Sequence, residues 1–348
     1  MESAIAEHLR CPRSTPSALR EGWQPPYPSY VARFAPTVDR IGMMILGAQF
    51  PDSQTVPAEV ATARAELLDS LVNHCGAKRF DEVGYVDEAG FRTVATVAYW
   101  DDADAYREAL EQLRKSWLSD ARVDGAAGYF IEAIAPSLDR VETLYSSDRV
   151  QGVALLADGL SGDILEHGYW GSARDRLARA QTDRLEPTPE TAAVQQDSGR
   201  RIVPGRQNLC LIRSGQDWSE TDGDERQMYL GDVEPVLRAG MEFLRDDGES
   251  IGCYSNRYVR VLDTSGNDTD QSFGLSWWRS LTDLDSWAKD HPTHKAIFGE
   301  AMRYLSSLGP AARLRLTHEV MVVQAQDQHF EYVNCHAGTG LLATTPAV

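Results

Sequence analysis

The chain has 348 residues, of which 42% are hydrophobic and 25% are charged, the balance of a globular protein long enough to bury a sizeable core. Its 34 basic and 52 acidic residues give a formal net charge of −18, which repels nucleic-acid backbones and anionic membranes, so we expect neither as a partner. No run approaches the roughly 18 apolar residues of a membrane span, and the first residues lack the apolar core of a signal peptide, so we expect a cytoplasmic chain.

Residues 1–40 are predicted to form an irregular N-terminal arm. Five prolines between Pro12 and Pro28 forbid a long helix in this segment. The aromatic residues Trp23, Tyr27 and Tyr30 give the arm apolar weight with which to lie against a surface. We therefore expect an ordered strap, and a subunit boundary is one place where it could lie.

The segment 41–141 shows strand-like and helix-like patterns in the order β-α-β-β-α-β. The period-two and period-three-to-four patterns predict four strands and two helices. The expected strands are 41–50, 81–86, 91–100 and 125–135, and the expected helices are 58–74 and 102–117.

Residues 207–326 repeat this order, which predicts an internal duplication. Expected here are strands at 208–213, 254–262 and 272–278, helix within 217–245 with a kink at Pro235, a segment 281–290 that leads into a helix, and a last strand near 314–322. The tripeptides 99–101 (YWD) and 277–279 (WWR) each lead from a strand toward a helix and support the repeat. The predicted fold class is α+β. Two ferredoxin-like units would close face to face into a dimeric α+β barrel-like body with an apolar pocket for a cofactor.

The connector, residues 142–206, fits neither unit, and residues 327–348 are left as a C-terminal tail. The connector contains EHGYWGSARDR at 166–176. A helical reading of this motif puts Leu165, Tyr169, Ser172 and Arg176 on one face, so that Arg176 points inward. The alternative is that Arg176 pairs with a surface carboxylate.

Two histidines stand at positions where apolar side chains are expected. Pro292 marks a helix start, and the helix from about residue 292 to 307 carries His294, Phe298, Ala301, Leu305 and Leu308 at helical spacing, so His294 heads an apolar face. In the following strand, His318 alternates inward with Leu314, Leu316, Val320 and Val322.

A buried imidazole needs a partner, and burial favours the neutral form that binds metals. One explanation is a pair of core histidines, each hydrogen-bonded to a carbonyl. The other is that one histidine ligates a metal while the second faces the open coordination position. The five scattered cysteines form no C-x-x-C pair, which predicts reduced thiols and argues against structural zinc.

Several motifs in a common order carry a family resemblance over nearly the whole chain. They are MESAI at the start, QPPYP at 24–28, ETLY at 142–145, EHGYWGSARDR at 166–176, LIRSGQDW at 211–218, GCYSNR at 252–257, HPTH at 291–294 and the strand around residue 318. The chain resembles the haem-containing aldoxime dehydratases. The resemblance implies a homodimeric haem b enzyme, active with ferrous iron, that converts an aldoxime into a nitrile.

The resemblance also implies roles for particular residues. His294 would be the proximal iron ligand, His318 the distal acid and base, and Ser214 a hydrogen-bond donor to the oxime hydroxyl, with Arg176 and Glu142 as polar supports. Two plainer readings stay open: Ser214 could cap a helix that begins near residue 217, and Glu142 could be a solvated carboxylate. Other functions stay open too, namely a haem peroxidase or oxygenase, and a haem carrier or gas sensor.

Overall fold

The computed structural model describes residues 1–52, 55–188, 194–197 and 199–344, and mixes helices and strands along the chain. Its strands are β1 (Ala32–Arg33), β2 (Gly42–Pro51), β3 (Arg79–Val86), β4 (Phe91–Trp100), β5 (Gly128–Ile134), β6 (Val141–Tyr145), β7 (Gly159–Leu160), β8 (Gln195–Asp197), β9 (Arg200–Val203), β10 (Leu209–Asp217), β11 (Cys253–Leu262), β12 (Asp268–Trp278), β13 (Arg315–Val323) and β14 (Gln328–Val333). Its α-helices are α1 (Ala58–Asn73), α2 (Ala103–Trp117), α3 (Ser172–Arg176), α4 (Gly223–Met228), α5 (Glu234–Asp246), α6 (Leu281–Asp290) and α7 (Pro292–Leu308).

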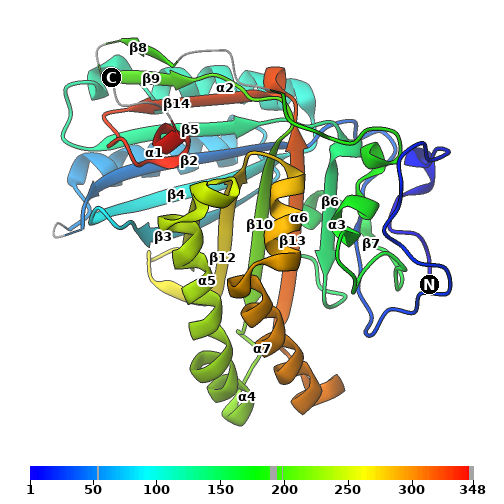
Figure 1. Cartoon of the computed structure of the whole chain (residues 1–348). Helices are drawn as coiled ribbons and strands as arrows, with labels where there is room; N and C mark the ends of the chain where they lie inside the picture. The colour runs from blue at the N-terminus through cyan, green and yellow to red at the C-terminus, as the bar shows by residue number, and fades with distance from the viewer. Residues whose placement is uncertain (53–54, 189–193, 198, 345–348) are drawn as a thin grey trace.

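Within the described residues, twelve strands form one curled antiparallel sheet, a half-barrel, in the order β6-β13-β10-β12-β11-β3-β4-β2-β5-β14-β9-β8. Strands β3, β4, β2 and β5 form one quartet of neighbours, and β11, β12, β10 and β13 form the other. The quartets join where Arg260 lies opposite Gly84 and Val261 opposite Val83. They run in different directions in Figure 1, so the sheet curls at this junction.

The first quartet is covered on both faces. Strand β2 is buried along all but its last residue. Its Met44 and Leu46 pack in a core with α1 and α2, whereas Met43 and Ile45 pack in a second core that side chains of both quartets share. This alternation is the period-two pattern of a strand between two layers.

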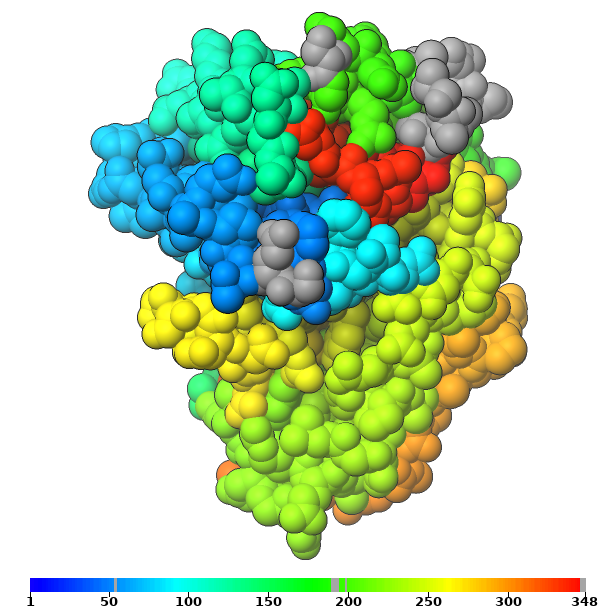
Figure 2. All heavy atoms as spheres, turned by 90° about the vertical axis from the view of Figure 1, so that its left-hand side faces the viewer, coloured from blue at the N-terminus to red at the C-terminus, as the bar shows by residue number. Residues whose placement is uncertain are grey.

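Helices α5, α6 and α7 lie in front of the second quartet (Figure 1), and α4 continues α5 downward. A π-helical turn, Tyr229–Val233, separates α4 from α5 just before Pro235. Pro235 cannot donate a backbone hydrogen bond, and the helical pattern is interrupted just before it by this π-helical turn. The kink predicted at Pro235 stays a prediction. Figure 2 shows the same helical region as the lower part of the face that it presents, with the first quartet and its helices above.

The connector differs from expectation, because it adds strands to the sheet. Strand β6 pairs with β13 at one edge, and β9 pairs with β14, which pairs with β5. The helical reading of 165–176 is wrong for its first part, because α3 begins only at Ser172 after a left-handed Gly171 with φ 91°. An L-residue with a side chain rarely adopts such a φ, so the chain turns at this glycine before the helix starts.

Helix α7 matches its predicted bounds, but the predicted inward stripe is only partly correct. Phe298 is 40% exposed, and Tyr304 is the only buried residue on the helix. Ile297 packs against α5 at Gly240, where a Cβ atom would lie 2.5 Å from its Cδ1. The helix therefore contacts α5 through Ile297, which is not part of the predicted stripe. His294 and Phe298 of the stripe contact Trp170 instead.

All five cysteines lie among the described residues and are free, as predicted. In the part of the chain that the structure describes, no helix is long and apolar enough to cross a membrane. The N-terminal arm is an ordered strap: Tyr30 pairs with Tyr145, and β1 pairs with β7. It runs beside β6, β7 and α3 on the right of Figure 1.

Candidate active site

Helix α7 carries His294 in its first turn. Pro292 occupies the first helical position, where its missing N–H costs no hydrogen bond. Nδ1 of His291 accepts from the Thr293 N–H at 3.3 Å, and the His291 ring stacks on Phe243 with centroids 4.4 Å apart. His291 thus serves as the helix cap, which leaves His294 as the candidate metal ligand of this segment.

The His294 imidazole lies among aromatic rings. Its centroid is 4.6 Å from that of Trp287 and 5.8 Å from that of Trp170, which in turn contacts Phe298 at 5.2 Å. Nδ1 is buried without a hydrogen bond of normal geometry, and the Ala288 carbonyl is the backbone acceptor that interacts with the ring. Burial lowers the pKa of His294 to about 4, so the ring is neutral near pH 7 and has a lone pair for a metal.

His318 lies on β13 directly opposite Ser214 on β10. Opposed residues of antiparallel strands point to the same face, with Cβ atoms about 4.5–5.5 Å apart. The two side chains are therefore neighbours on the face that the helices cover. Ser214 does not cap a helix, because β10 continues to Asp217 and α4 begins only at Gly223.

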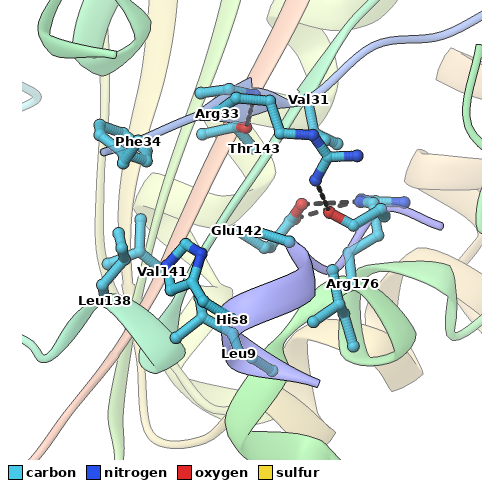
Figure 3. Close-up of a pocket in the computed structure, with 15 residues that line it drawn as sticks. His8, Leu9, Val31, Arg33, Phe34, Leu138, Val141, Glu142, Thr143 and Arg176 are labelled. Atoms are coloured by element: carbon cyan, nitrogen blue, oxygen red, sulfur yellow. Dashed lines mark hydrogen bonds and ion pairs between the residues drawn. The ribbon is translucent and has the colours of Figure 1, made fainter. Parts of the chain in front are cut away.

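Glu142 on β6 forms a buried, bidentate ion pair with Arg176 of α3, as Figure 3 shows. Nε of Arg176 lies 2.7 Å from Oε2 and Nη2 lies 3.1 Å from Oε1, and the two side chains are 1% and 2% exposed. Glu142 is opposite Val320 on β13, two residues from His318, so it points to the same face as His318. Arg176 does point inward. Its carboxylate partner is buried, so Arg176 does not pair with a surface carboxylate and Glu142 is not exposed to bulk solvent.

The remaining contacts of Arg176 fix its guanidinium in place. Nη1 donates to the Glu166 carbonyl at 3.0 Å and to the Ser172 hydroxyl at 3.1 Å. A planar guanidinium held from several sides has little rotational freedom. It can therefore present its charge to His318 from a constant position.

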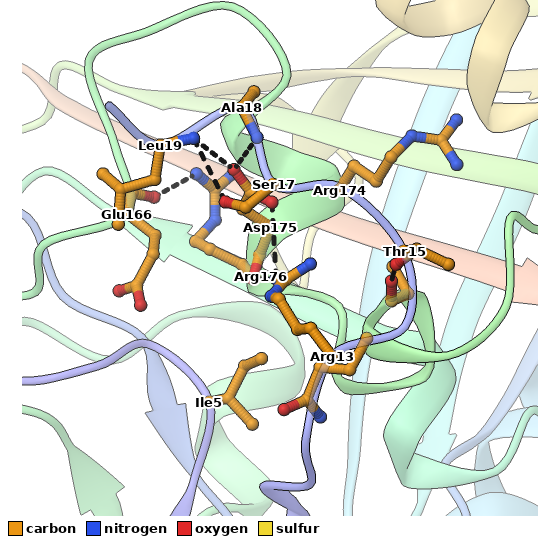
Figure 4. Close-up of polar contacts among 12 residues, drawn as sticks. Ile5, Arg13, Thr15, Ser17, Ala18, Leu19, Glu166, Arg174, Asp175 and Arg176 are labelled. Atoms are coloured by element: carbon orange, nitrogen blue, oxygen red, sulfur yellow. Dashed lines mark hydrogen bonds and ion pairs between the residues drawn. The ribbon is translucent and has the colours of Figure 1, made fainter. Parts of the chain in front are cut away.

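Asp175, a residue that the sequence did not single out, ties the strap to α3 (Figure 4). Its carboxylate accepts from the N–H groups of Ala18 at 2.9 Å and Leu19 at 3.1 Å, and from the Tyr169 hydroxyl at 3.0 Å. It also pairs with Arg13 at 3.3 Å. The only signal in the sequence was its place between two arginines of the EHGYWGSARDR motif.

His167, of the same motif, was also missed. His167 is 1% exposed, and neither nitrogen of its ring has a hydrogen-bond partner among the described residues. Burial, together with the charge of Arg176, lowers the pKa of His167 to about 4. A neutral imidazole therefore lies within electrostatic range of the Arg176 guanidinium, and its ring centroid is 5.3 Å from that of Tyr27.

His294, His318, Arg176 and Glu142 lie close enough to influence one another's charge states. Burial, then the charge of Arg176, then His294 lower the pKa of His318 to about 4, so both histidines are neutral near pH 7. Burial raises the pKa of Glu142, an effect that Arg176 partly offsets. Each residue from which a role was expected, Ser214 included, faces this region.

The residues around His294 suit a flat, largely apolar cofactor that carries a metal. Trp170 and Phe298 are each 40% exposed beside the neutral imidazole, so the apolar surface and the lone pair lie together. Imidazole is a common axial ligand of haem iron. The residues present therefore fit haem, with His294 as the ligand and His318 on the facing sheet.

Comparison with known proteins defines the class. The chain matches the family model for haem-containing dehydratases over residues 44–341. The chain belongs to this family, and a dehydratase is a lyase.

The more particular relatives are aldoxime dehydratases. The chain is 42% identical to the aliphatic aldoxime dehydratase of Pseudomonas chlororaphis and 40% identical to that of Rhodococcus erythropolis, in each case over 98% of both chains. It is 34% identical to the phenylacetaldoxime dehydratase of Bacillus sp. strain OxB-1, over 85% of this chain and 90% of that protein. A crystal structure of an aldoxime dehydratase in complex with butyraldoxime is 39% identical, with a TM-score of 0.94 over 100% of this chain and 98% of that one.

Proposed function

We propose that this protein dehydrates aldoximes, R–CH=N–OH, to nitriles, with haem held by His294. The observation that carries the proposal is the Ser214 and His318 pair, which lies beside the buried Glu142–Arg176 ion pair and within electrostatic range of His294. The substrate class is supported by relatives of about 40% identity that are aldoxime dehydratases and by the similar structure that holds butyraldoxime.

The chain supplies the proton transfers. When bound, ferrous haem supplies an electron-rich centre for the oxime nitrogen, which weakens the N–O bond. Because His318 is neutral near pH 7, it first takes up a proton from solvent. It gives this proton to the hydroxyl oxygen as the N–O bond breaks with both electrons going to oxygen, so that water leaves. Neutral His318 then takes the proton from carbon as the C≡N bond forms. Ser214 donates a hydrogen bond to the hydroxyl and holds it near His318.

The low pKa of His318 suits a residue that must lose its proton readily. Arg176 disfavours a second positive charge nearby, and Glu142 neutralises Arg176, so this pair sets the proton affinity of His318. The reaction consumes and returns one proton in each turnover. No net oxidation occurs, which agrees with an enzyme that needs no oxidant.

The other haem functions are less well supported. A peroxidase or oxygenase would use peroxide or dioxygen, and a haem carrier or gas sensor would turn over no substrate. The family and the relatives are dehydratases, so the comparisons do not favour these readings.

The direct test is anaerobic incubation of the haem-loaded, dithionite-reduced protein with butyraldoxime and phenylacetaldoxime, with nitrile measured by gas chromatography. Nitrile should form without peroxide or oxygen. Failure of both aldoximes with haem bound, or turnover that depends on peroxide, would contradict the proposal.

We further propose haem b as the cofactor and ferrous iron as the active state. The scattered cysteines offer no C-x-x-C-H segment for covalent attachment of a c-type haem, which supports a non-covalently bound group. A pyridine haemochrome spectrum of the purified protein tests the type of haem. Activity before and after dithionite addition tests the iron state.

We propose that the two quartets are duplicated ferredoxin-like units in a homodimeric, cytoplasmic protein. Each quartet has the spatial order fourth, first, third, second strand of its unit. A reciprocal contact supports the duplication: the Tyr99 hydroxyl donates to Glu319, and the corresponding Trp277 Nε1 donates to Glu132, both at 2.8 Å. The proposed divisions stay at 1–40, 41–141, 142–206, 207–326 and 327–348.

A further inference from the structure

A small cavity lies beneath the N-terminal strap, on the side of the Glu142–Arg176 pair that the strap covers (Figure 3). Its volume is about 40 Å³. The sheet edge and α3 contribute Glu142 and Arg176 to its wall, and the strap contributes Ala4, His8 and Arg33. His8 is exposed, so the cavity reaches toward the molecular surface at this residue.

The cavity is large enough for water. An ordered water needs roughly 10–15 Å³ of such space, so about three waters fit. Cavities stay dry when their walls are apolar, but this wall carries a carboxylate and two guanidinium groups.

Glu142 has unused hydrogen-bonding capacity toward this cavity. A carboxylate can accept about four hydrogen bonds. Each of its oxygens accepts one from Arg176. Water molecules in the cavity could satisfy the rest, and bridging waters stabilise a buried charge almost as well as direct contacts do.

We propose that this cavity is a hydration site whose water molecules donate hydrogen bonds to the Glu142 carboxylate. Because the strap forms part of the cavity wall, it would then contribute to the site around His318. The strap is firmly held there: Arg33 donates to the carbonyls of Ser3 and Ala4, and the Ala32 N–H donates to the Thr143 hydroxyl at 2.9 Å. The ligand is water. Its role rests on the proposed function of Glu142 as the partner of Arg176.

The pKa of Glu142 depends on the charged and titratable groups that surround it. Arg176 of α3, together with Arg33 and His8 of the strap, lines the same cavity, while His318 of β13 shares its sheet face and Asp285 of α6 interacts with it electrostatically. Burial raises the pKa of Glu142. Hydrogen bonds from water to the ionised carboxylate act in the opposite direction and keep Arg176 paired.

The first test asks whether the cavity holds water. A high-resolution crystal structure of the holoenzyme should show ordered water within hydrogen-bonding distance of Glu142, and Ala4→Leu should displace it. Ala18→Leu makes the same chemical change at an exposed strap position outside the cavity and should leave the water in place. A dry cavity in the wild type would overturn the proposal, whatever the enzyme's substrate is.

The second test asks whether the water matters to the reaction. In Ala4→Leu, the acidic limb of the turnover-against-pH profile should move to higher pH by about one unit, because a hydrogen bond to a charged group is lost. Haem content and turnover at high pH should match those of Ala18→Leu. If Ala4→Leu does not fold, Ala178→Leu enlarges another residue that lines the cavity and should fill it instead.

An unchanged profile in a variant whose crystal structure shows the cavity filled would also overturn the proposal. Glu142→Gln distinguishes the proposed role of Glu142 in the reaction from the presence of water in the cavity. If that variant keeps full turnover, the proposed role of Glu142 fails, while the presence of water in the wild-type cavity is still decided by the crystal structure.

Discussion

His291 and His294 lie three residues apart at the start of α7 but have different roles: His291 caps the helix, and His294 is the candidate metal ligand. His291 lies before the first turn, where its ring nitrogen accepts from an orphan backbone N–H. His294 lies inside the turn, where the backbone needs no partner from its side chain. Its imidazole packs against Trp287, and burial keeps it neutral.

Replacing His294 with alanine should remove most of the haem, because the axial ligand is lost. Haem content per protein, measured by the pyridine haemochrome assay, tests this. His291→Ala is the matched control: it should keep the haem and lose about 1 kcal/mol of stability as a cap. Full haem with an unchanged spectrum in His294→Ala would show that the ligand lies elsewhere.

His318→Asn should keep the haem and still bind aldoxime, as read from the absorption spectrum. Loss of a positioned acid and base typically lowers a rate by about a hundred to ten thousand fold, so nitrile formation should fall by at least the smaller figure. The result to watch for is a six-coordinate ferrous spectrum in the wild type that becomes five-coordinate in the variant. That outcome would make His318 an iron ligand instead.

Ser214→Ala should also keep the haem, because Ser214 lies opposite His318 on the sheet, whereas the proposed iron ligand His294 lies on α7. Its loss removes one hydrogen bond to the leaving group, and removal of one such donor costs about 100–1,000 fold in kcat in enzymes that depend on it. Ser214→Thr keeps the hydroxyl and should recover part of the activity. Loss of haem with turnover per bound haem preserved would reassign Ser214 to cofactor binding.

At the scale of helices and strands, the sequence pattern predicted the bounds of elements that are determined by residues within the element itself. The bounds of α1, α2 and α7 agree with expectation within one or two residues, since caps and apolar periodicity lie within each segment. The register that sets Ser214 against His318 could not be predicted, because it depends on a strand about a hundred residues away. Strand β6 was missed because a five-residue edge strand has too little pattern to be recognised.

The N-cap of α2 gives a test of element stability away from the site. The Asp102 carboxylate accepts from the N–H groups of Asp104 and Ala105, each at 2.9 Å. Asp102→Ala should lower the free energy of unfolding by about 1 kcal/mol, measured by urea denaturation, and leave turnover unchanged. Asp104→Ala alters an exposed first-turn residue that makes no cap and should cost less; equal losses would argue against a capping role for Asp102.

For the whole molecule, buried charges join segments that are distant in the sequence. Glu132 pairs with Arg257 from the other quartet through bonds of 2.7 and 2.5 Å, and Arg213 reaches Asp81 across the curl at 2.7 Å. Breaking a buried pair typically costs about 3–5 kcal/mol. Such pairs hold the two quartets in one relative position. Their partners could not be matched from the sequence, because they lie more than a hundred residues apart and no local pattern links them.

Glu331 on β14 provides a pH test at this scale. Burial raises its pKa, but hydrogen bonds from His329, Arg114 and Arg200 outweigh burial and lower the pKa to about 2. Because the folded pKa lies below the unfolded value, the stabilisation is fully present above about pH 4.5 and disappears as the pH falls toward 2.

Unfolding free energies of the wild type and Glu331→Gln should therefore differ at pH 7 and converge as the pH falls from about 4.5 toward 2. Glu111→Gln is the control, since its exposed carboxylate also approaches Arg114, at 3.6 Å, and should contribute little. A difference that does not change with pH would rule out this ionisation as its source.

The strap also has a consequence for synthesis. Residues 3 and 18 are made first, yet their partners Glu166 and Asp175 lie 163 and 157 positions later. At roughly 5–20 residues per second, a ribosome needs about ten to thirty seconds to reach them. During that interval these two partners of the arm do not yet exist, so the arm can dock against α3 only after residues 41–141, which form the first quartet, have been synthesised.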